Sequence, residues 1–547
     1  MTREDPATPV STAPRPNKVE PVSGVKLALI VCPMYFGVFL GALDGTVVTA
    51  LLSHIASDLH ELSRVSWIAT GYLVACAAFQ PLYGKISDIF GRKEVLIFCN
   101  VMFAIGCLIC GVSYNLEWLV AGRVVSGIGG GGIMSLSTIA VSDLVPLRLR
   151  GIFQGFGNIS FGMGAGVGGV VGGILTDKYG WRFVFTIQVP FICLSIFLLS
   201  VFFKPGKRST ARSRAPSEED PLLTDNTTEE PKEETRREKF RRIDVLGACT
   251  LVSTLLVLMF AIATAGDQFA WSSPVIIGLL VLSFLLACAF VYVELYIAKE
   301  PVIAIELFSN RTITASSFTN LFGTMAVYSI LFYAPIFYAS VFGMTPTAVG
   351  ERLGGNFFGV AFGSFSSGIL MAKTGKYYTL GCLSGILLIL GSAIIVSITP
   401  ESPVFLQYVS LFLTGTGYSG MLTVTLLALI SAAHHDYQAI TTSIQYAFRG
   451  IGSTLGVSIA SSIFRNVLKT QLYENVHGEK ADAIIKKVLD SVDAIRQIPI
   501  EYQPAVIASY NVASKVVLST ALAMGVLSVI CSALMREHKL HSTIERD

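Results

Sequence analysis

The sequence predicts an all-α polytopic membrane protein, and three observations support this prediction. Of the 547 residues, 52% are hydrophobic and only 14% are charged, a balance far more apolar than that of ordinary soluble domains. The apolar residues gather in windows of about 20 residues, the length that a helix needs to cross a bilayer. Lys and Arg are concentrated in alternate short connections between these windows, as expected when every second connection faces the cytosol.

Fourteen windows qualify as predicted spans, and an even number places both termini on one side of the membrane. The Lys and Arg distribution makes that side cytosolic. The predicted spans lie at 27–52, 66–84, 95–113, 118–142, 151–175, 183–203, 244–264, 274–297, 314–341, 348–371, 379–398, 404–431, 439–464 and 515–535.

The spans divide into two six-helix bundles with two extra helices between them. The predicted organisation is a disordered cytosolic tail at 1–26, a first bundle at 27–203, a charged cytosolic linker at 204–243, two inserted helices at 244–297, a second bundle at 311–535 with an outer loop at 465–514, and a cytosolic tail at 536–547. Within the outer loop, apolar residues at helical spacing from Ala481 to Ile495 predict a short amphipathic helix.

A charged turn flanked by glycines connects the second and third spans. It contains Gly84, Asp88, Gly91 and Arg92 within the run from Tyr83 to Lys93. Such a turn between two apolar spans is typical of the cytoplasmic hinge of a secondary transporter. Gly368 and Gly375, followed by Lys376, repeat the spacing of Gly84, Gly91 and Arg92, which favours two related halves.

Further motifs follow in a consistent order along the chain. They are Leu43 to Val48 in the first span, Ala121 to Gly131 in the fourth, and the glycine-rich run from Gly157 to Gly173 in the fifth. Together with the charged turn, these motifs resemble those of the major facilitator superfamily, and the first-span motif is similar to that of its fourteen-span drug:proton antiporter branch. Within that branch, the chain looks most like the fungal vacuolar basic amino acid transporters. The resemblance covers nearly the whole chain between the tails and implies the major facilitator fold, with alternating access between the two bundles.

Asp44 is the most informative single residue. A carboxylate near the middle of the membrane costs roughly 2.5 to 3.5 kcal/mol on insertion scales, so it should face a polar cavity or a partner. We expect a site that alternately holds a proton and a cationic solute; the alternative is a helix-capping or packing role. For Arg123 the resemblance implies a part in proton transfer or charge balance. The alternative is a structural ion pair, for example with Asp44.

Two further sets of residues are assigned by the resemblance. Asp88 and Arg92, with Gly84 and Gly91, would form an inner gate in which Asp88 caps or pairs with a helix of the second half; the alternative is a solvated turn. Small residues in the fifth span remove side chains from a helix face so that another backbone can approach. We expect these glycines to pack on the tenth span: Gly164, Gly168, Gly172 and Gly173.

In the second half, the polar residues of apolar spans are candidates for the substrate cavity: Asn320, Asn356, Gln445 and Arg449. A guanidinium offers two parallel donors to a carboxylate, so Arg449 is a candidate for binding a solute carboxylate. Alternatively, it pairs with a backbone carbonyl or another helix. In the linker, Glu218, Leu222 and Leu223 match an acidic dileucine pattern read by sorting adaptors, and with the resemblance they favour the vacuolar membrane.

These observations predict a transporter and argue against an enzyme, because the sequence has no evident nucleophile, metal or nucleotide-binding constellation. We expect exchange of protons for a small cationic solute, either lysine, arginine or histidine, carried from cytosol to vacuole. No cofactor or metal is expected, and the basic residues form no face for nucleic acid. Membrane lipid surrounds the spans. The alternatives are a plasma-membrane exporter of drugs or organic cations, and a transceptor that no longer transports.

Overall fold

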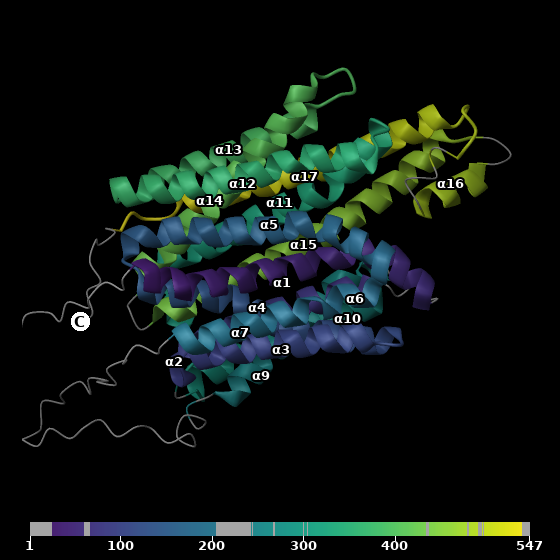
Figure 1. The fold of residues 1–547 in the computed structure, drawn as a ribbon. Coiled ribbons are helices and arrows are strands. Elements are labelled where there is room, and N and C mark those ends of the chain that lie inside the picture. The colour runs from purple at the N-terminus through teal and green to yellow at the C-terminus, as the bar shows by residue number, and fades with distance from the viewer. Residues whose placement is uncertain are drawn as a thin grey trace, which may run out of the picture.

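The computed structural model describes residues 24–59, 66–203, 242, 244–265, 269–298, 300–303, 305–433, 437–477, 481–490, 495 and 497–538. Nearly all of these residues are helical (Figure 1). The helices are α1 (Gly24–Leu59), α2 (Ser66–Phe90), α3 (Arg92–Val112), α4 (Leu116–Leu144), α5 (Leu147–Tyr179), α6 (Trp181–Thr186), α7 (Gln188–Phe202), α9 (Val245–Thr264), α10 (Pro274–Tyr296), the 3-10 helix η1 (Ile305–Ser309), α11 (Arg311–Val341), α12 (Pro346–Thr374), α13 (Tyr378–Ser397), α14 (Val404–Ala432), α15 (Gln438–Asn475), α16 (Ala481–Asp490) and α17 (Gln503–Ala533).

Each of the fourteen predicted spans coincides with a long helix, or in the sixth case with the pair α6 and α7. Within the described residues, eleven of them are both long and apolar enough to cross a membrane. The other three, α2, α5 and α15, are 25, 33 and 38 residues long but contain more polar residues or glycines. Helix α1 begins and α17 ends at the same end of the bundle (Figure 1). We call this end, where Gly91 joins α2 to α3, the inner end.

The predicted outer loop at 465–514 is largely helical, which corrects the sequence prediction. Helix α15 continues to Asn475, α16 follows, and α17 begins at Gln503, twelve residues before the predicted span. The helices extend beyond the predicted apolar windows because buried residues in the additional helical turns pack on one another. Leu468 and Leu472 of α15 join Ile485 and Val488 of α16 in one apolar cluster.

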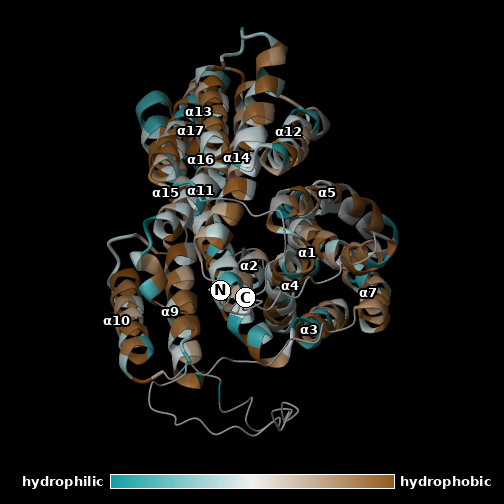
Figure 2. Cartoon of the chain, turned by 90° about the vertical axis from the view of Figure 1, so that its left-hand side faces the viewer, coloured by the Kyte–Doolittle hydropathy of each residue, from teal (hydrophilic) through white to brown (hydrophobic). Residues whose placement is uncertain are grey.

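The two six-helix halves meet along two seams. Helix α2 of the first half packs on α15 of the second, and α5 of the first half packs on α12 of the second. Figure 2 looks along the bundle and shows α5 beside α12 on one side, with α15 on the other. Movement between the halves therefore has to change the contacts along these two seams.

The inserted helices α9 and α10 form a hydrophobic pair beside the bundle (Figure 2). Leu251 and Leu255 of α9 share an apolar cluster with Leu82 of α2 and Ile444 of α15. The connection between α9 and α10 is also attached to α15, because Trp271 Nε1 donates a 2.7 Å hydrogen bond to Ser462 Oγ. The insert thus covers the seam between α2 and α15.

Candidate transport site

Asp44 of α1 and Arg123 of α4 form an ion pair inside the first half. Arg123 Nη1 lies 2.5 Å from Asp44 Oδ2, and the two side chains are 1% and 0% exposed. Arg123 Nε donates to the backbone oxygen of Ile68 at 3.2 Å, and the guanidinium carbon lies 4.3 Å from the centre of the Tyr72 ring. Asp44 therefore has a partner rather than solvent contact, and in this conformation no solute can reach it.

A second polar contact to Asp44 comes from Gln188, which the sequence reasoning did not single out. Gln188 Nε2 lies 3.4 Å from Asp44 Oδ1, and Gln188 is the first residue of α7, directly after the break at Ile187. The sequence signal for this contact is a glutamine within an apolar span. Arg123 Nη2 and Gln188 Oε1 have no hydrogen-bond partner among the described residues. The pair is therefore held by single contacts, which are weaker than a bidentate arrangement.

Arg92 organises the charged turn at the inner end. It pairs with Asp88 at 2.8 Å and with Asp143 of α4 at 2.9 Å, and its Nη1 donates to Ser87 Oγ. Gly91 has a φ of 103°, a conformation that favours glycine. Arg92 thus connects Asp88 of the turn to α4 of the same half, and the role of these residues as a gate stays a prediction.

Two glycines allow close approach between the halves near the inner end. A Cβ on Gly84 of α2 would lie 2.7 Å from the backbone oxygen of Ala439 on α15, and one on Gly368 of α12 would lie 2.6 Å from that of Gly151 on α5. The two glycines occupy equivalent positions in the predicted repeat. The repeat is therefore visible as matching contacts, one at each seam.

The predicted partner of the fifth-span glycines is wrong for three of them. Gly164, Gly168 and Gly172 face α1, where a Cβ would meet Phe39, Thr46 or Val47 respectively, and a Cβ on Gly173 would meet no atom within 4 Å. Gly162 of the same run does face the tenth span as predicted, since a Cβ on it would lie 3.4 Å from Phe357 of α12, and Gly151 and Gly155 also approach α12. Glycine spacing marks a smooth helix face, but it does not specify which helix covers that face.

An uncharged hydrogen-bonded chain joins the halves, and the sequence reasoning missed it. Tyr446 of α15 bonds to Thr138 of α4 at 2.6 Å, and Thr138 bonds to Gln154 of α5 at 3.4 Å. Gln154 donates to Asn158 at 3.0 Å, and Asn158 donates to Ser364 of α12 at 3.0 Å. We call these five residues the inter-half chain. Polar side chains within apolar spans were the only indication, since such residues commonly bond across membrane helices.

Three of the four predicted cavity residues are buried in the second half. Gln445 Nε2 lies 3.4 Å from Asn320 Oδ1, and Asn356 Nδ2 donates to the backbone oxygen of Leu411 at 3.3 Å. Their exposed fractions are at most 6%, so in this conformation they connect helices and do not line an open cavity. Arg449 differs because it keeps some exposed surface.

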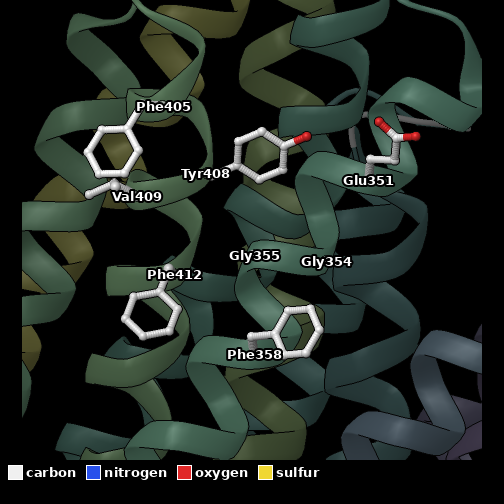
Figure 3. Close-up of a pocket in the computed structure, with 8 residues that line it drawn as sticks. All are labelled: Glu351, Gly354, Gly355, Phe358, Phe405, Tyr408, Val409 and Phe412. Atoms are coloured by element: carbon white, nitrogen blue, oxygen red, sulfur yellow. The ribbon is translucent and has the colours of Figure 1, made fainter.

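A pocket of about 390 Å³ lies between α12 and α14 (Figure 3). Glu351 and Phe358 of α12 and three residues of α14 contribute to its wall: Phe405, Tyr408 and Phe412. Phe358 and Phe405 are 67% and 72% exposed. Because these side chains lie on the outside of the second half, the pocket has the character of a lipid-facing groove. It contains neither Asp44 nor Arg449.

Glu218, Leu222 and Leu223 lie outside the described residues. Their role in sorting therefore stays a prediction.

Comparison with known proteins agrees with this architecture. The profile of the Major Facilitator Superfamily matches residues 34–457. The chain is 34% identical to the multidrug resistance protein fnx1 of Schizosaccharomyces pombe, over 94% of this chain and 93% of that protein. It is 32% identical to the vacuolar membrane amino acid uptake transporter fnx2 of the same organism, over 89% of this chain and 80% of that protein.

A similar relative is the vacuolar basic amino acid transporter 2 of Saccharomyces cerevisiae, which is 32% identical over 83% of this chain and 94% of its own length. Among solved structures, that of the human organic anion transporter MFSD10 superposes with a TM-score of 0.58, covering 92% of this chain and 99% of that one at 13% identity. At that identity the likeness concerns the fold alone.

Proposed function

Because this chain belongs to the major facilitator superfamily, and is therefore a membrane transporter, we propose that it is a proton-coupled antiporter that moves basic amino acids from the cytosol into the vacuole. The observation that carries the proton coupling is the buried ion pair of Asp44 and Arg123. The substrate class and the compartment are supported by relatives named as vacuolar amino acid transporters.

In this proposal the proton, and not the solute, occupies Asp44. The sequence alone suggested that proton and solute take turns on this carboxylate, but its side chain has no exposed surface. Protonation of Asp44 removes the charge that compensates Arg123. An uncompensated charge in a buried site is costly, by several kcal/mol in typical cases. Proton binding therefore destabilises this packing of the first half, and proton release restores it.

Helix α4 provides a physical connection from this pair to the closure between the halves. Arg123 and Thr138 lie on the same helix, and Thr138 bonds directly to Tyr446 of the second half. A shift of α4 that relieves Arg123 would also disturb the inter-half chain. Rigid movement of a packed helix is a common way in which a local charge change alters a distant interface.

Proton-driven accumulation in isolated vacuolar vesicles tests this role of Asp44. Asp44→Asn should abolish accumulation of labelled lysine driven by a pH gradient, because the amide cannot exchange a proton. Exchange of labelled for unlabelled lysine without a gradient should persist, since that exchange needs no proton transfer. The exposed Asp482 of α16 provides the matched control Asp482→Asn, which should behave like the wild type. Unchanged gradient-driven accumulation by Asp44→Asn would reject the assignment.

A second candidate function is export of drugs or organic cations across the plasma membrane, and the similarity to fnx1, which is named a multidrug resistance protein, favours it. Location separates the two. We expect a tagged protein on the vacuolar membrane, and a variant with Leu222→Ala and Leu223→Ala displaced from it while its lysine uptake in vesicles is unchanged. A wild-type protein found at the plasma membrane would favour the exporter.

A further inference from the structure

Arg449 is an arginine in the middle of the second half that forms no ion pair with any of the described residues. It lies 11 residues after the first residue of α15 (449 − 438), which is about 17 Å along the helix axis. None of the ion pairs formed by the described residues includes it. Its side chain keeps some exposed surface at this depth.

Three tyrosines from three helices surround this guanidinium. Its central carbon lies 5.0 Å from the centre of the Tyr446 ring on α15. Tyr418 of α14 and Tyr328 of α11 both interact with it electrostatically. Tyr418 is also positioned by Thr324, whose hydroxyl lies 3.2 Å away. The site is thus one cation and three tyrosines; the hydroxyls of Tyr328 and Tyr418 can donate hydrogen bonds, whereas that of Tyr446 bonds to Thr138.

No anionic side chain of the part of the chain that the structure describes pairs with this guanidinium. A charged side chain in a membrane span is costly and usually pairs with an opposite charge or marks a substrate path. Arg123 has such a partner in Asp44. At Arg449 the described residues provide only neutral tyrosines, which leaves the planar fork of donors available. A carboxylate matches that fork, because it accepts two parallel hydrogen bonds from one guanidinium.

The site also lies next to the closure between the halves. Tyr446 contacts Arg449 through its ring and Thr138 of α4 through its hydroxyl. A Cβ on the adjacent Gly450 would lie 2.7 Å from the Ala77 side chain of α2. A group bound at Arg449 is therefore one helical turn from the inter-half chain, where its arrival affects the residues that hold the halves together.

We propose that Arg449, with Tyr328, Tyr418 and Tyr446, binds the carboxylate of the transported solute. The proposal rests on the proposed transport of amino acids and makes it more specific. The solute must carry a carboxylate as well as its cationic group, so lysine is accepted and its decarboxylated analogue cadaverine is discriminated against. The proton and the solute carboxylate then bind at separate sites, the proton in the first half and the carboxylate in the second.

Uptake of labelled lysine and labelled cadaverine into vesicles tests this inference. The wild type should prefer lysine. Arg449→Gln should lower lysine uptake at subsaturating concentration by about 10- to 100-fold, as expected for loss of charge-assisted hydrogen bonds, and should leave cadaverine uptake unchanged. The preference therefore disappears. Arg465→Gln, on the exposed outer part of the same helix, is the matched control and should keep the wild-type preference.

If Arg449→Gln does not reach the membrane, Tyr418→Phe provides the same readout with a smaller expected fall in the lysine-to-cadaverine ratio. An unchanged ratio in the variant that does reach the membrane would overturn this inference while leaving amino acid transport in place. A wild type that takes up neither compound would instead overturn the proposed function, and this inference with it.

Discussion

The two halves of this transporter hold their membrane-embedded arginines in opposite ways. In the first half, Arg123 is 1% exposed and paired with Asp44. In the second half, Arg449 is partly exposed and surrounded by tyrosines, without an ion pair among the described residues. In the proposals above, the paired and buried charge responds to a proton, and the accessible charge responds to an anionic group. The two ligands of a proton-coupled exchanger would then bind in different halves of the same fold.

The largest expected difference between the two arginines is in their effect on the free energy of unfolding. Arg123→Gln leaves the Asp44 carboxylate buried without a counter-charge, so we expect a loss of about 3 to 5 kcal/mol in the free energy of unfolding. Arg449→Gln removes no ion pair among the residues that the structure describes, and we expect a change within about 1 kcal/mol. Denaturant unfolding of the purified proteins in detergent measures both.

The double variant Asp44→Asn with Arg123→Gln provides the internal control. It leaves no stranded charge, so it should recover much of the stability lost by Arg123→Gln alone. Equal losses in Arg123→Gln and Arg449→Gln would mean that Arg449 has a structural role, and the contrast between the halves would fail.

The two seams, by comparison, are alike, and substitutions at their glycines should show this. Gly84→Ala and Gly368→Ala each place a methyl group within 3 Å of a backbone oxygen of the other half. Overpacking of this kind costs about 1 to 3 kcal/mol, which would shift the balance between conformations by about 5- to 150-fold. Both variants should therefore open the inner end, and distances between spin labels on the inner ends of the two halves should lengthen.

Gly173→Ala is the matched glycine control, because its added methyl group would meet no atom within 4 Å. It should leave the spin-label distances unchanged. If Gly84→Ala opened the inner end and Gly368→Ala did not, the two seams would not be equivalent in function. The seam between α2 and α15 would then control access without the seam between α5 and α12.

The sequence predicts the fold well, because hydropathy and helix length depend on local composition. All fourteen predicted spans coincide with helices, eleven of which are apolar enough to cross a membrane, and the spacing of Gly84 and Gly91 matches that of Gly368 and Gly375. The errors arose where tertiary packing decides. Helix α15 continues past its apolar window because Leu468 and Leu472 are buried by α16, a contact that hydropathy does not encode.

The site was predicted less completely for a similar reason. Asp44 and Arg123 were identified as residue types that need partners, and their pairing was one of the alternatives. By contrast, the partner of Gly164 and Gly168 was wrong, and Gln188 and the inter-half chain were missed. Uncharged polar residues such as Thr138 and Asn158 are common in membrane helices. Only their positions relative to one another distinguish a hydrogen-bonded chain from isolated polar residues.

The smallest expected effect concerns the two inner turns, which the halves secure differently. Arg92 joins the turn between α2 and α3 to Asp143, whereas its repeat equivalent Lys376 is exposed. The turn between α12 and α13 is held instead by Tyr377, whose hydroxyl donates to the backbone oxygen of Arg536 at 2.6 Å. Burial raises the pKa of this hydroxyl above its ordinary value, so it remains a donor at neutral pH.

Arg92→Gln should therefore speed hydrogen exchange in the turn between α2 and α3 and lower lysine uptake several-fold. The expected cost is about 1 kcal/mol, because Asp143 is 35% exposed and solvent screens the pair. Lys376→Gln should change neither quantity. Tyr377→Phe should speed exchange only in the turn between α12 and α13, and by less, since a neutral hydrogen bond is weaker than a charge-assisted one. If Lys376→Gln changed hydrogen exchange or lysine uptake more than Arg92→Gln did, both halves would require a positive charge at this position of the repeat. The contact of Arg92 with Asp143 of α4 would then not be the important feature.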